Sequence, residues 1–377
     1  MMHDDFETDL RGLAGRGRLR ALRERAGIDF TSNDYLGLAE SDELRQAAVD
    51  AIARGVPIGS GGSRLLRGNH SEHEALESEA AAYFGAETAL YFGGGYVANF
   101  AIFSTLPQRG DLVVHDELVH ASVHEGMRRG RADYAGVSHN DVGAFEDAIR
   151  RWRVAGGKGR PWIAVESLYS MDGDSPDLND LLAVADRHDA MIVIDEAHAT
   201  GVLGPQGRGL AAAFEGRENV LTLHTCGKAL GTVGGFIVGP KVIRDFLVNR
   251  ARPFIFATAP SPLIAAVTRA SLQLSRTDSA RRERLASLVN FAGRELRRRC
   301  DLAPSGSHIL PVVIGADQAA VALAASLQRR GFDIRAIRPP TVPEGTARLR
   351  IALTLNVNEA VVAELFAALS EDMRVAA

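Results

Sequence analysis

The sequence predicts an α/β fold, with a mainly parallel sheet in a large domain and a smaller C-terminal α+β domain. The first observation is that short, continuous apolar runs alternate with helix-like segments up to about residue 260. Strands buried on both faces of a parallel sheet have this continuous apolar character. The second is that a long Arg-rich helical stretch and then further strands follow. The third is the length of 377 residues, which suits two domains.

The predicted elements of the large domain follow one another closely. The predicted strands are residues 88–92, 111–116, 161–167, 190–196, 219–224 and 234–239. The clearest predicted helices are residues 72–85, 142–153 and 177–189. We expect helices to cover both faces of the sheet.

The two ends of the chain have a different pattern. Residues 1–40 are predicted to form an N-terminal arm or helix, with 16-RGRLRALRER-25 as a short amphipathic helix or arm. Residues 41–260 would then form the large domain and residues 261–377 the small one. The small domain begins with a helical stretch over 262–299. Its later apolar runs, 309–315, 332–338 and 347–353, should form a sheet of their own.

Composition excludes several classes of function. A net charge of -4 gives no general reason to expect nucleic-acid or membrane binding. No apolar run reaches membrane-spanning length, and the N-terminus has no apolar signal core. Two cysteines, Cys226 and Cys300, make no disulfide framework. We therefore expect a protein of the reducing cytoplasm.

One lysine stands out in a chain that otherwise uses arginine. Of 43 basic residues three are lysine. Lys158 and Lys241 lie in polar or turn-like surroundings, whereas Lys228 follows an apolar run in 221-LTLHTCGKALGTVGGFIVG-239. A lysine amine can be neutral and nucleophilic, which an arginine guanidinium cannot. Lys228 is therefore a candidate catalytic residue.

The run 191-MIVIDEAHATG-201 places Asp195 and His198 at a strand end. Ligands of parallel sheets bind outside the C-terminal ends of the strands. DEAH also resembles a nucleotide-hydrolysis motif, but that function requires GxxxxGK[ST], and GGKGR and CGKAL lack the Ser or Thr. A solvated loop acid is the simplest alternative for Asp195 alone.

Four further positions follow predicted strands. The glycine turn in 92-FGGGYVANF-100 could bind a phosphate with its backbone N–H groups, although a plain tight turn is an equal alternative. His120, Ser170 and Thr225 could each be structural, since isolated histidines and turn hydroxyls usually are. Taken together, the glycine turn, the strand-end Asp195 and the isolated Lys228 suggest pyridoxal 5'-phosphate. This cofactor needs an amine for its Schiff base, an acid at the ring nitrogen and an anion site.

The motifs, taken in order, resemble one enzyme family. They are SNDYLGL (32–38), GSGGSRLLRGNHSEHEALE (59–77), HNDV (139–142), SMDGDSPDL (170–178), DEAHATGVLGPQGRG (195–209) and TCGKALGTVGG (225–235). This series resembles the α-oxoamine synthases over essentially the whole chain. The resemblance implies a fold-type I, aspartate aminotransferase-like enzyme that contains pyridoxal phosphate, condenses an amino acid with an acyl thioester and releases carbon dioxide.

The resemblance implies a role for each residue around the cofactor ring. Lys228 would carry the cofactor as a Schiff base and then move the substrate α-proton. Asp195 would pair with the ring nitrogen, and His198 would hydrogen-bond the phenolic oxygen. His120 would stack on the ring, and Ser170 would contact the phenolic side.

The resemblance also implies a phosphate site that two chains share. The backbone of Gly95 and Tyr96 would bind the phosphate together with Thr225. Thr258, in 254-FIFATAPSP-262, would reach the phosphate of a second copy. An obligate homodimer with a shared active site is therefore implied.

Substrate contacts are implied as well. Arg350 would bind the amino-acid carboxylate in the bidentate way that arginine allows, and Asn33 would lie near the substrate. Arg18 or Arg20 would face the acyl group. The interval before SNDYLGL is shorter than is common in the family, so the choice between these two arginines stays open.

Segments 59–77 and 337–354 most resemble the branch that joins L-alanine to a pimeloyl thioester in biotin biosynthesis. The thiol would belong to coenzyme A or to an acyl-carrier protein. The main alternative is a branch that uses glycine with acetyl-CoA or succinyl-CoA. An aminotransferase or lyase of the same fold would share Lys228 and Asp195. Neither metal nor nucleic acid is expected as a ligand.

Overall fold

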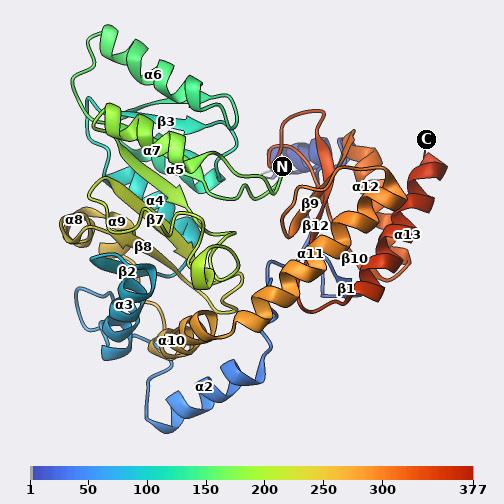
Figure 1. The fold of residues 1–377 in the computed structure, drawn as a ribbon, viewed down its shortest axis with the longest axis horizontal. Helices are drawn as coiled ribbons and strands as arrows, with labels where there is room; N and C mark the ends of the chain where they lie inside the picture. Colours follow the sequence, from blue (N-terminus) through green and yellow to red (C-terminus); the bar gives the residue numbers. More distant parts are fainter. Residues whose placement is uncertain (1–2, 377) are drawn as a thin grey trace. The chain divides into compact units, whose positions relative to one another are not determined.

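The computed structural model describes residues 3–376 and forms two compact units. The large unit contains residues 36–170 and 175–282. The small unit contains the chain up to residue 35, residues 171–174, and the chain from residue 283 onward. Figure 1 shows the helices and strands of both units.

A seven-stranded sheet forms the centre of the large unit (Figure 1). Its order is β2 (Thr88–Phe92), β8 (Gly235–Gly239), β7 (Val220–Thr225), β6 (Met191–Asp195), β5 (Pro161–Glu166), β3 (Leu112–Asp116) and β4 (Asp133–Val137). Strand β8 is antiparallel to β2 and β7, and the other pairs are parallel. The predicted mainly parallel sheet is confirmed, and six of its strands lie at the predicted apolar runs.

Helices cover both faces of this sheet. The helices of the large unit are α2 (Asp42–Ala53), α3 (Ser71–Phe84), α4 (Gly95–Thr105), α5 (Ala121–Arg129), α6 (Val142–Val154), α7 (Leu178–Arg187), α8 (Lys241–Arg250), α9 (Arg252–Ile255) and α10 (Pro262–Thr277), with the short 3-10 helix η1 (Pro205–Gly207). Side chains of α4, α5, α8 and α9 share one apolar core with the sheet. Side chains of α6 and α7 pack in a second core, and those of α3 and α10 in a third.

Alternation along β6 shows which face each residue meets. Met191 and Val193 belong to the core under α4 and α5, whereas Ile192 and Ile194 belong to the core under α6 and α7. Successive side chains of a strand point to opposite faces. The Asp195 side chain therefore points to the same face as Met191 and Val193, under α4, and the Glu196 side chain points to the opposite face.

The small unit has two sheets of its own. Strands β11 (Ala336–Ile337), β12 (Ala347–Ala352) and β9 (Ile309–Gly315) form an antiparallel sheet. Strands β1 (Ile28–Asp29) and β10 (Phe332–Asp333) form a parallel pair. The helices are α1 (Asp4–Gly15), α12 (Asp317–Arg329) and α13 (Glu359–Ala376), with most of α11 (Ser279–Cys300). The separate sheet predicted for this part of the chain is present.

Two local predictions need correction, and one strand was not predicted. The N-terminal helix is α1. Residues 16–25 were predicted as a helix or an arm, and the helix alternative is wrong, because Gly17 has a φ of 68° just after α1 ends. The stretch 262–299 is two helices, since Asp278 leaves helical geometry and its Oδ1 accepts the Arg281 N–H. Strand β4 was not predicted, because DYAGV lies at the sheet edge and is mostly exposed.

Two negative findings apply to the described residues. Within residues 3–376, no helix is both long and apolar enough to cross a membrane. Within the same range, no group of three or more His, Cys, Asp or Glu side chains could hold a metal ion. Cys226 and Cys300 are free thiols.

Candidate active site

A cavity of about 150 Å³ lies at the C-terminal ends of β5, β6 and β7, on the α4 face of the sheet. It is lined by Gly95, Tyr96, Asn99, His120, Glu166, Asp195, Ala197, His198, Leu223, Thr225 and Lys228. The cavity therefore lies where an open parallel sheet is expected to bind ligands. It also gathers most of the residues that the sequence predicted for the cofactor.

Lys228 and His198 meet at this cavity. Lys228 follows β7 and is half-buried, and its Nζ lies 2.8 Å from Nε2 of His198. His198 follows β6 and is buried. The contact places an amine beside an imidazole, so a proton can pass between them or be held there.

A tight turn holds Lys228 in place. The Gly231 N–H donates to the Lys228 carbonyl at 2.8 Å, and the Cys226 N–H donates to the Gly234 carbonyl at 2.9 Å. Gly231 has a φ of 63°, and a Cβ there would lie 2.6 Å from the Ala39 nitrogen. Glycine is therefore required on steric and backbone grounds. The small residues around Lys228 serve the turn as well as the cavity.

Asp195 is a buried carboxylate held by two neutral donors. The Ala197 N–H donates to Oδ1 at 2.8 Å, and Nδ2 of Asn99 donates to Oδ2 at 2.6 Å. The side chain is 6% exposed. Hydrogen bonds to the ionised form compensate part of the cost of burying a charge. A cationic N–H of a ligand would complete the compensation.

His120 has a structural position and also faces the cavity. It is the N-cap of α5, where its Nδ1 accepts the Ser122 N–H at 3.3 Å and lies 2.7 Å from the Ser122 hydroxyl. Burial lowers the pKa of His120, although the Asp195 carboxylate opposes this shift. The ring is therefore neutral at pH 7. A neutral aromatic ring suits stacking on a ligand ring.

The N-terminus of α4 forms the anion-binding part of the cavity. Gly95 is its first residue, and a Cβ there would lie 3.4 Å from Oγ1 of Thr225. The Thr225 hydroxyl and the first N–H groups of α4 therefore converge, and a helix N-terminus favours anions. Tyr96 follows on α4, with its ring edge-on to His120 at 6.2 Å between centroids.

Two polar residues of the cavity were not among the predicted site residues. Glu166 ends β5 inside a predicted apolar run, and Asn99 lies one turn into α4. Asn99 Oδ1 and Glu166 Oε1 are buried and have no hydrogen-bond partner within residues 3–376. Strand alternation was the available signal for Glu166, since it shares a face with Asp195. Ser170 is buried and donates its N–H to Glu166 Oε2.

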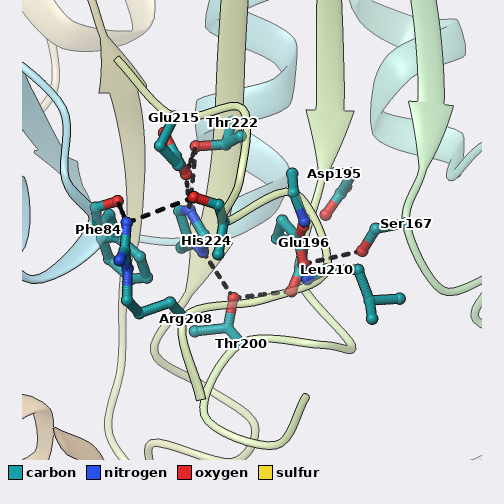
Figure 2. Close-up of polar contacts among 12 residues, drawn as sticks. Phe84, Ser167, Asp195, Glu196, Thr200, Arg208, Leu210, Glu215, Thr222 and His224 are labelled. Atoms are coloured by element: carbon teal, nitrogen blue, oxygen red, sulfur yellow. Dashed lines mark hydrogen bonds and ion pairs between the residues drawn. The ribbon is translucent and has the colours of Figure 1, made fainter. Parts of the chain in front are cut away.

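The opposite face of the same strand ends carries a second polar cluster (Figure 2). We call it the back cluster; it consists of Ser167, Glu196, Thr200, Glu215, Thr222 and His224. Glu196 accepts from the Ser167 hydroxyl at 2.9 Å and the Leu210 N–H at 3.0 Å, and also from the Ala211 N–H. Thr200 Oγ1 lies 2.8 Å from Nδ1 of His224. The back cluster joins β5, β6 and β7.

The predicted substrate residues lie in the small unit. Arg350 is on β12 and 7% exposed, and its Nη2 donates to the Tyr35 hydroxyl at 3.2 Å. That hydroxyl donates to Asn33 Oδ1 at 2.9 Å. The structure therefore links Arg350 and Asn33 through Tyr35, which sequence reasoning had not selected.

The two N-terminal arginines differ. Arg18 Nε lies 2.6 Å from Asp317 Oδ2, and its Nη2 lies 2.6 Å from Glu344 Oε2. These two carboxylates raise the pKa of Arg18 above its ordinary value. Arg20 is exposed. Arg18 is thus already neutralised within the small unit.

Thr258 lies apart from the cavity residues of its own chain. It is exposed, between α9 and α10, and does not line the cavity. Its predicted contact with a second copy stays a prediction.

Comparison with known proteins identifies the family. Residues 25–369 match the family model described as aminotransferase class I and II. The chain belongs to this family. Its similarity to curated members is extensive, and three of them show its range.

An 8-amino-7-oxononanoate synthase of Anaeromyxobacter dehalogenans (strain 2CP-1) is 43% identical over 348 residues, covering 92% of this chain and 86% of that protein. One of Azoarcus sp. (strain BH72) is 42% identical over 378 residues, covering 96% and 95%. One of Herminiimonas arsenicoxydans is 39% identical over 389 residues, covering 98% and 99%.

Solved structures agree with this assignment. A serine palmitoyltransferase from S. paucimobilis superposes with a TM-score of 0.89 at 26% identity, covering 99% of this chain and 98% of that one. An 8-amino-7-oxononanoate synthase from Francisella tularensis gives 0.78 at 26% identity, covering 93% and 98%. The predicted fold-type I transferase fold and the resemblance to the α-oxoamine synthases are confirmed.

Proposed function

We propose that this chain joins L-alanine to a pimeloyl thioester and releases carbon dioxide and a free thiol. The product would be 8-amino-7-oxononanoate, a biotin precursor. The observation that carries the proposal is the contact between Lys228 Nζ and His198 Nε2 at 2.8 Å, at a cavity that also contains the Asp195 carboxylate. Curated relatives 43% identical to the chain have the name of this activity.

The cavity has the donors and acceptors that pyridoxal phosphate requires. The α4 N-terminus and the Thr225 hydroxyl suit the phosphate, Asp195 suits a protonated ring nitrogen, and Lys228 supplies the amine. The unpartnered oxygens of Asn99 and Glu166 show that the polar groups of the cavity are incomplete within the described chain. The residues therefore fit this cofactor.

When bound, pyridoxal phosphate supplies an electron sink for the carbanion formed at the amino-acid Cα. The Nζ amine of Lys228 would remove the Cα proton and later return one, with His198 positioning the amine. The Cα carbon attacks the thioester carbonyl, and the thiolate leaves with the electron pair of the C–S bond. The carboxylate of the amino acid then departs as carbon dioxide. Lys228 protonates the carbon atom from which the carboxylate departed.

The other cavity residues would hold the cofactor during these steps. Asp195 would keep the ring nitrogen protonated, and the neutral His120 ring would stack on the cofactor. His198 and Ser170 would bind the phenolic side. Gly95, Tyr96 and Thr225 would bind the phosphate through backbone N–H groups and the hydroxyl.

In the small unit, we propose that Arg350 binds the amino-acid carboxylate and that Asn33 assists it. Tyr35 would orient both, since it bonds each of them. Of the two N-terminal arginines, Arg20 is the better candidate for the acyl group. Arg18 already has two carboxylate partners.

We also propose a cytoplasmic homodimer in which Thr258 contributes to the phosphate site of the second copy. The free thiols of Cys226 and Cys300 support a reducing compartment. The exposure of Thr258 leaves it accessible to a second chain. Sedimentation of the purified protein should give a dimer mass, and a monomeric enzyme with full turnover would contradict this part of the proposal.

The test is spectroscopic and chemical. After incubation with pyridoxal phosphate the protein should be yellow, L-alanine should change the absorbance, and borohydride should fix the cofactor to Lys228. Carboxyl-labelled L-alanine should then release labelled carbon dioxide when pimeloyl-CoA or pimeloyl-acyl-carrier protein is added. A colourless protein, or a Lys228→Ala variant that turns over normally, would refute the proposal.

The alternative substrates are distinguished by the same assay. A glycine-using synthase would release labelled carbon dioxide from glycine with acetyl-CoA or succinyl-CoA and would ignore L-alanine with the pimeloyl thioester. An aminotransferase or lyase would act on the amino acid with no thioester present. Comparing coenzyme A with acyl-carrier protein identifies the thiol that the enzyme uses.

A further inference from the structure

Glu166 lies beside Asp195 at the cavity, and the mechanism above gives it no role. It ends β5 and pairs with Asp195 of β6 in the parallel register. Neighbours in register point to the same face of a sheet, so the two carboxyl groups lie side by side. Glu166 is 2% exposed and lines the cavity together with Asp195 and Lys228.

The two oxygens of Glu166 have different surroundings. Oε2 accepts the Ser170 N–H at 3.1 Å. Oε1 is buried and has no hydrogen-bond partner within residues 3–376. A buried polar atom without a partner is costly, and such atoms are rare in native proteins. A group that Oε1 can bond is therefore expected to enter the cavity.

The charges around Glu166 determine its protonation state. Burial, together with the neighbouring Asp195 carboxylate, raises the pKa of Glu166 to about 8, and Lys228 opposes this shift. The titratable groups that face the cavity with it are Tyr96, His120, Asp195, His198 and Lys228. Tyr169 lies close by on the same segment. Burial raises the pKa of Tyr169, and the Asp116 and Glu166 carboxyl groups add to this increase.

Of the two neighbouring carboxyls, Asp195 has the more complete set of hydrogen-bond donors. It accepts an N–H at each of its two oxygens, from Ala197 and Asn99. The Glu166 carboxyl accepts the Ser170 N–H at Oε2, while Oε1 has no partner within residues 3–376. The nearby His120 backbone N–H offsets only part of the rise in the pKa of Glu166. Two adjacent carboxyls tend to hold one negative charge between them. Glu166 is then the neutral member. Because Ser170 donates to Oε2, the acid proton lies on Oε1, which becomes a donor directed into the cavity.

We propose that Glu166 is a cofactor-binding residue that remains a neutral carboxylic acid and donates a hydrogen bond from Oε1 to the bound pyridoxal phosphate ring. The phenolic oxygen is the acceptor of matching chemistry, since Asp195 takes the ring nitrogen and Thr225 the phosphate. Ser170, which bonds Glu166, is assigned to the same phenolic side. This proposal rests on the proposed function.

The first part of the experiment uses the ligand-free full-length protein. Since the folded-state pKa of Glu166 is raised, its contribution to stability is complete below about pH 4.5 and is lost as the pH rises through about 8. In urea unfolding, the wild type should therefore lose stability relative to Glu166→Gln over that interval. A constant difference between the two proteins would overturn the neutral-acid assignment.

The second part measures pyridoxal phosphate binding. Glu166→Gln keeps a neutral donor and should bind with about the wild-type Kd at pH 7. Glu166→Ala should bind roughly tenfold more weakly, as expected for the loss of one buried hydrogen bond. Above pH 8 the ratio of the wild-type Kd to that of Glu166→Gln should rise, because ionised Glu166 no longer donates. A flat ratio, or wild-type affinity in Glu166→Ala, would overturn the cofactor contact.

Two controls separate the possible failures. Glu196→Gln changes a buried glutamate at the next strand end but on the opposite face, and its pyridoxal phosphate titration should match that of the wild type. If the ratio of the wild-type Kd to the Glu196→Gln Kd also rises above pH 8, as expected for Glu166→Gln, the effect is not specific to the cavity and the proposal fails. A wild type that does not bind pyridoxal phosphate refutes the proposed function, and with it the cofactor contact, whatever the unfolding data show.

Discussion

Two polar clusters occupy opposite faces of the same three strand ends, and they are completed in different ways. The cavity side has Glu166, Asp195 and Thr225, and the back cluster has the residues beside them in sequence, Ser167, Glu196 and His224. Asn99 and Glu166, which line the cavity, each keep a buried oxygen without a partner inside residues 3–376. Every side chain of the back cluster has a protein partner.

The difference shows how a fold separates stability from function at adjacent residues. The chain itself satisfies the back cluster, so that cluster ties β5, β6 and β7 together. The cavity cluster keeps buried oxygens of Asn99 and Glu166 without a partner within residues 3–376, so its polar groups are arranged at the expense of stability. Substitutions on the cavity side should therefore mainly change chemistry, and those in the back cluster should mainly change folding.

The largest expected effect is that of Asp195→Asn. This substitution keeps the shape of the side chain but removes the charge that would hold the ring nitrogen protonated. Turnover should fall by about 10²–10⁴-fold, the range typical of a lost acid–base group. The free energy of unfolding should change little, because the new amide can still accept the Ala197 N–H, and the Asn99 amide can turn so that its unpartnered Oδ1 accepts from the new NH2 group. Carbon dioxide release and urea unfolding measure the two quantities.

The outcome that contradicts this prediction is the reverse pattern. If Asp195→Asn unfolds much more easily while the folded fraction turns over normally, then Asp195 is a structural residue and the two faces do not differ as described.

The part of the site that follows from the order of the strands could be predicted from the sequence. Lys228, Asp195, His198, His120 and Thr225 gather at one cavity because parallel strands end at a common edge, which an apolar pattern alone reveals. Their catalytic roles stay predictions. Glu166 was missed because it lies inside an apolar run, where the face is decided by strand alternation and not by composition.

Other features depended on contacts between distant parts of the sequence. The pairing of Arg18 with Asp317 and Glu344 joins residues about 300 positions apart, and no local pattern predicts it. Arg18 lies in the segment 16–25 that was predicted as a helix or arm, and these ion pairs hold that segment against the rest of the small unit. Strand β4 was missed because its single neighbour, β3, leaves DYAGV partly exposed. Edge strands lack the continuous apolar run that marks buried ones.

A smaller effect, on stability, is expected for Glu196→Ala. The substitution leaves the Ser167 hydroxyl and the N–H groups of Leu210 and Ala211 without their acceptor. Each buried donor without a partner costs about 1–3 kcal/mol, so the free energy of unfolding should fall by about 3 kcal/mol or more. Urea unfolding measures the loss. Pyridoxal phosphate affinity of the folded protein should stay close to that of the wild type, and a large drop in affinity with unchanged stability would contradict the comparison.

The smallest effect is expected for Thr200→Val. Valine keeps the volume of threonine but removes the hydroxyl that lies 2.8 Å from His224 Nδ1 and donates to the Glu196 carbonyl at 2.7 Å. The free energy of unfolding should fall by about 1–2 kcal/mol, since two hydrogen bonds are lost and each has a net value of about 1 kcal/mol, with turnover unchanged. Thr200→Ser retains the hydroxyl and is the matched control. If Thr200→Val keeps the wild-type stability while Thr200→Ser loses it, then methyl packing and not the hydroxyl stabilises this position, and the back cluster is held together less by its polar contacts than by the surrounding core.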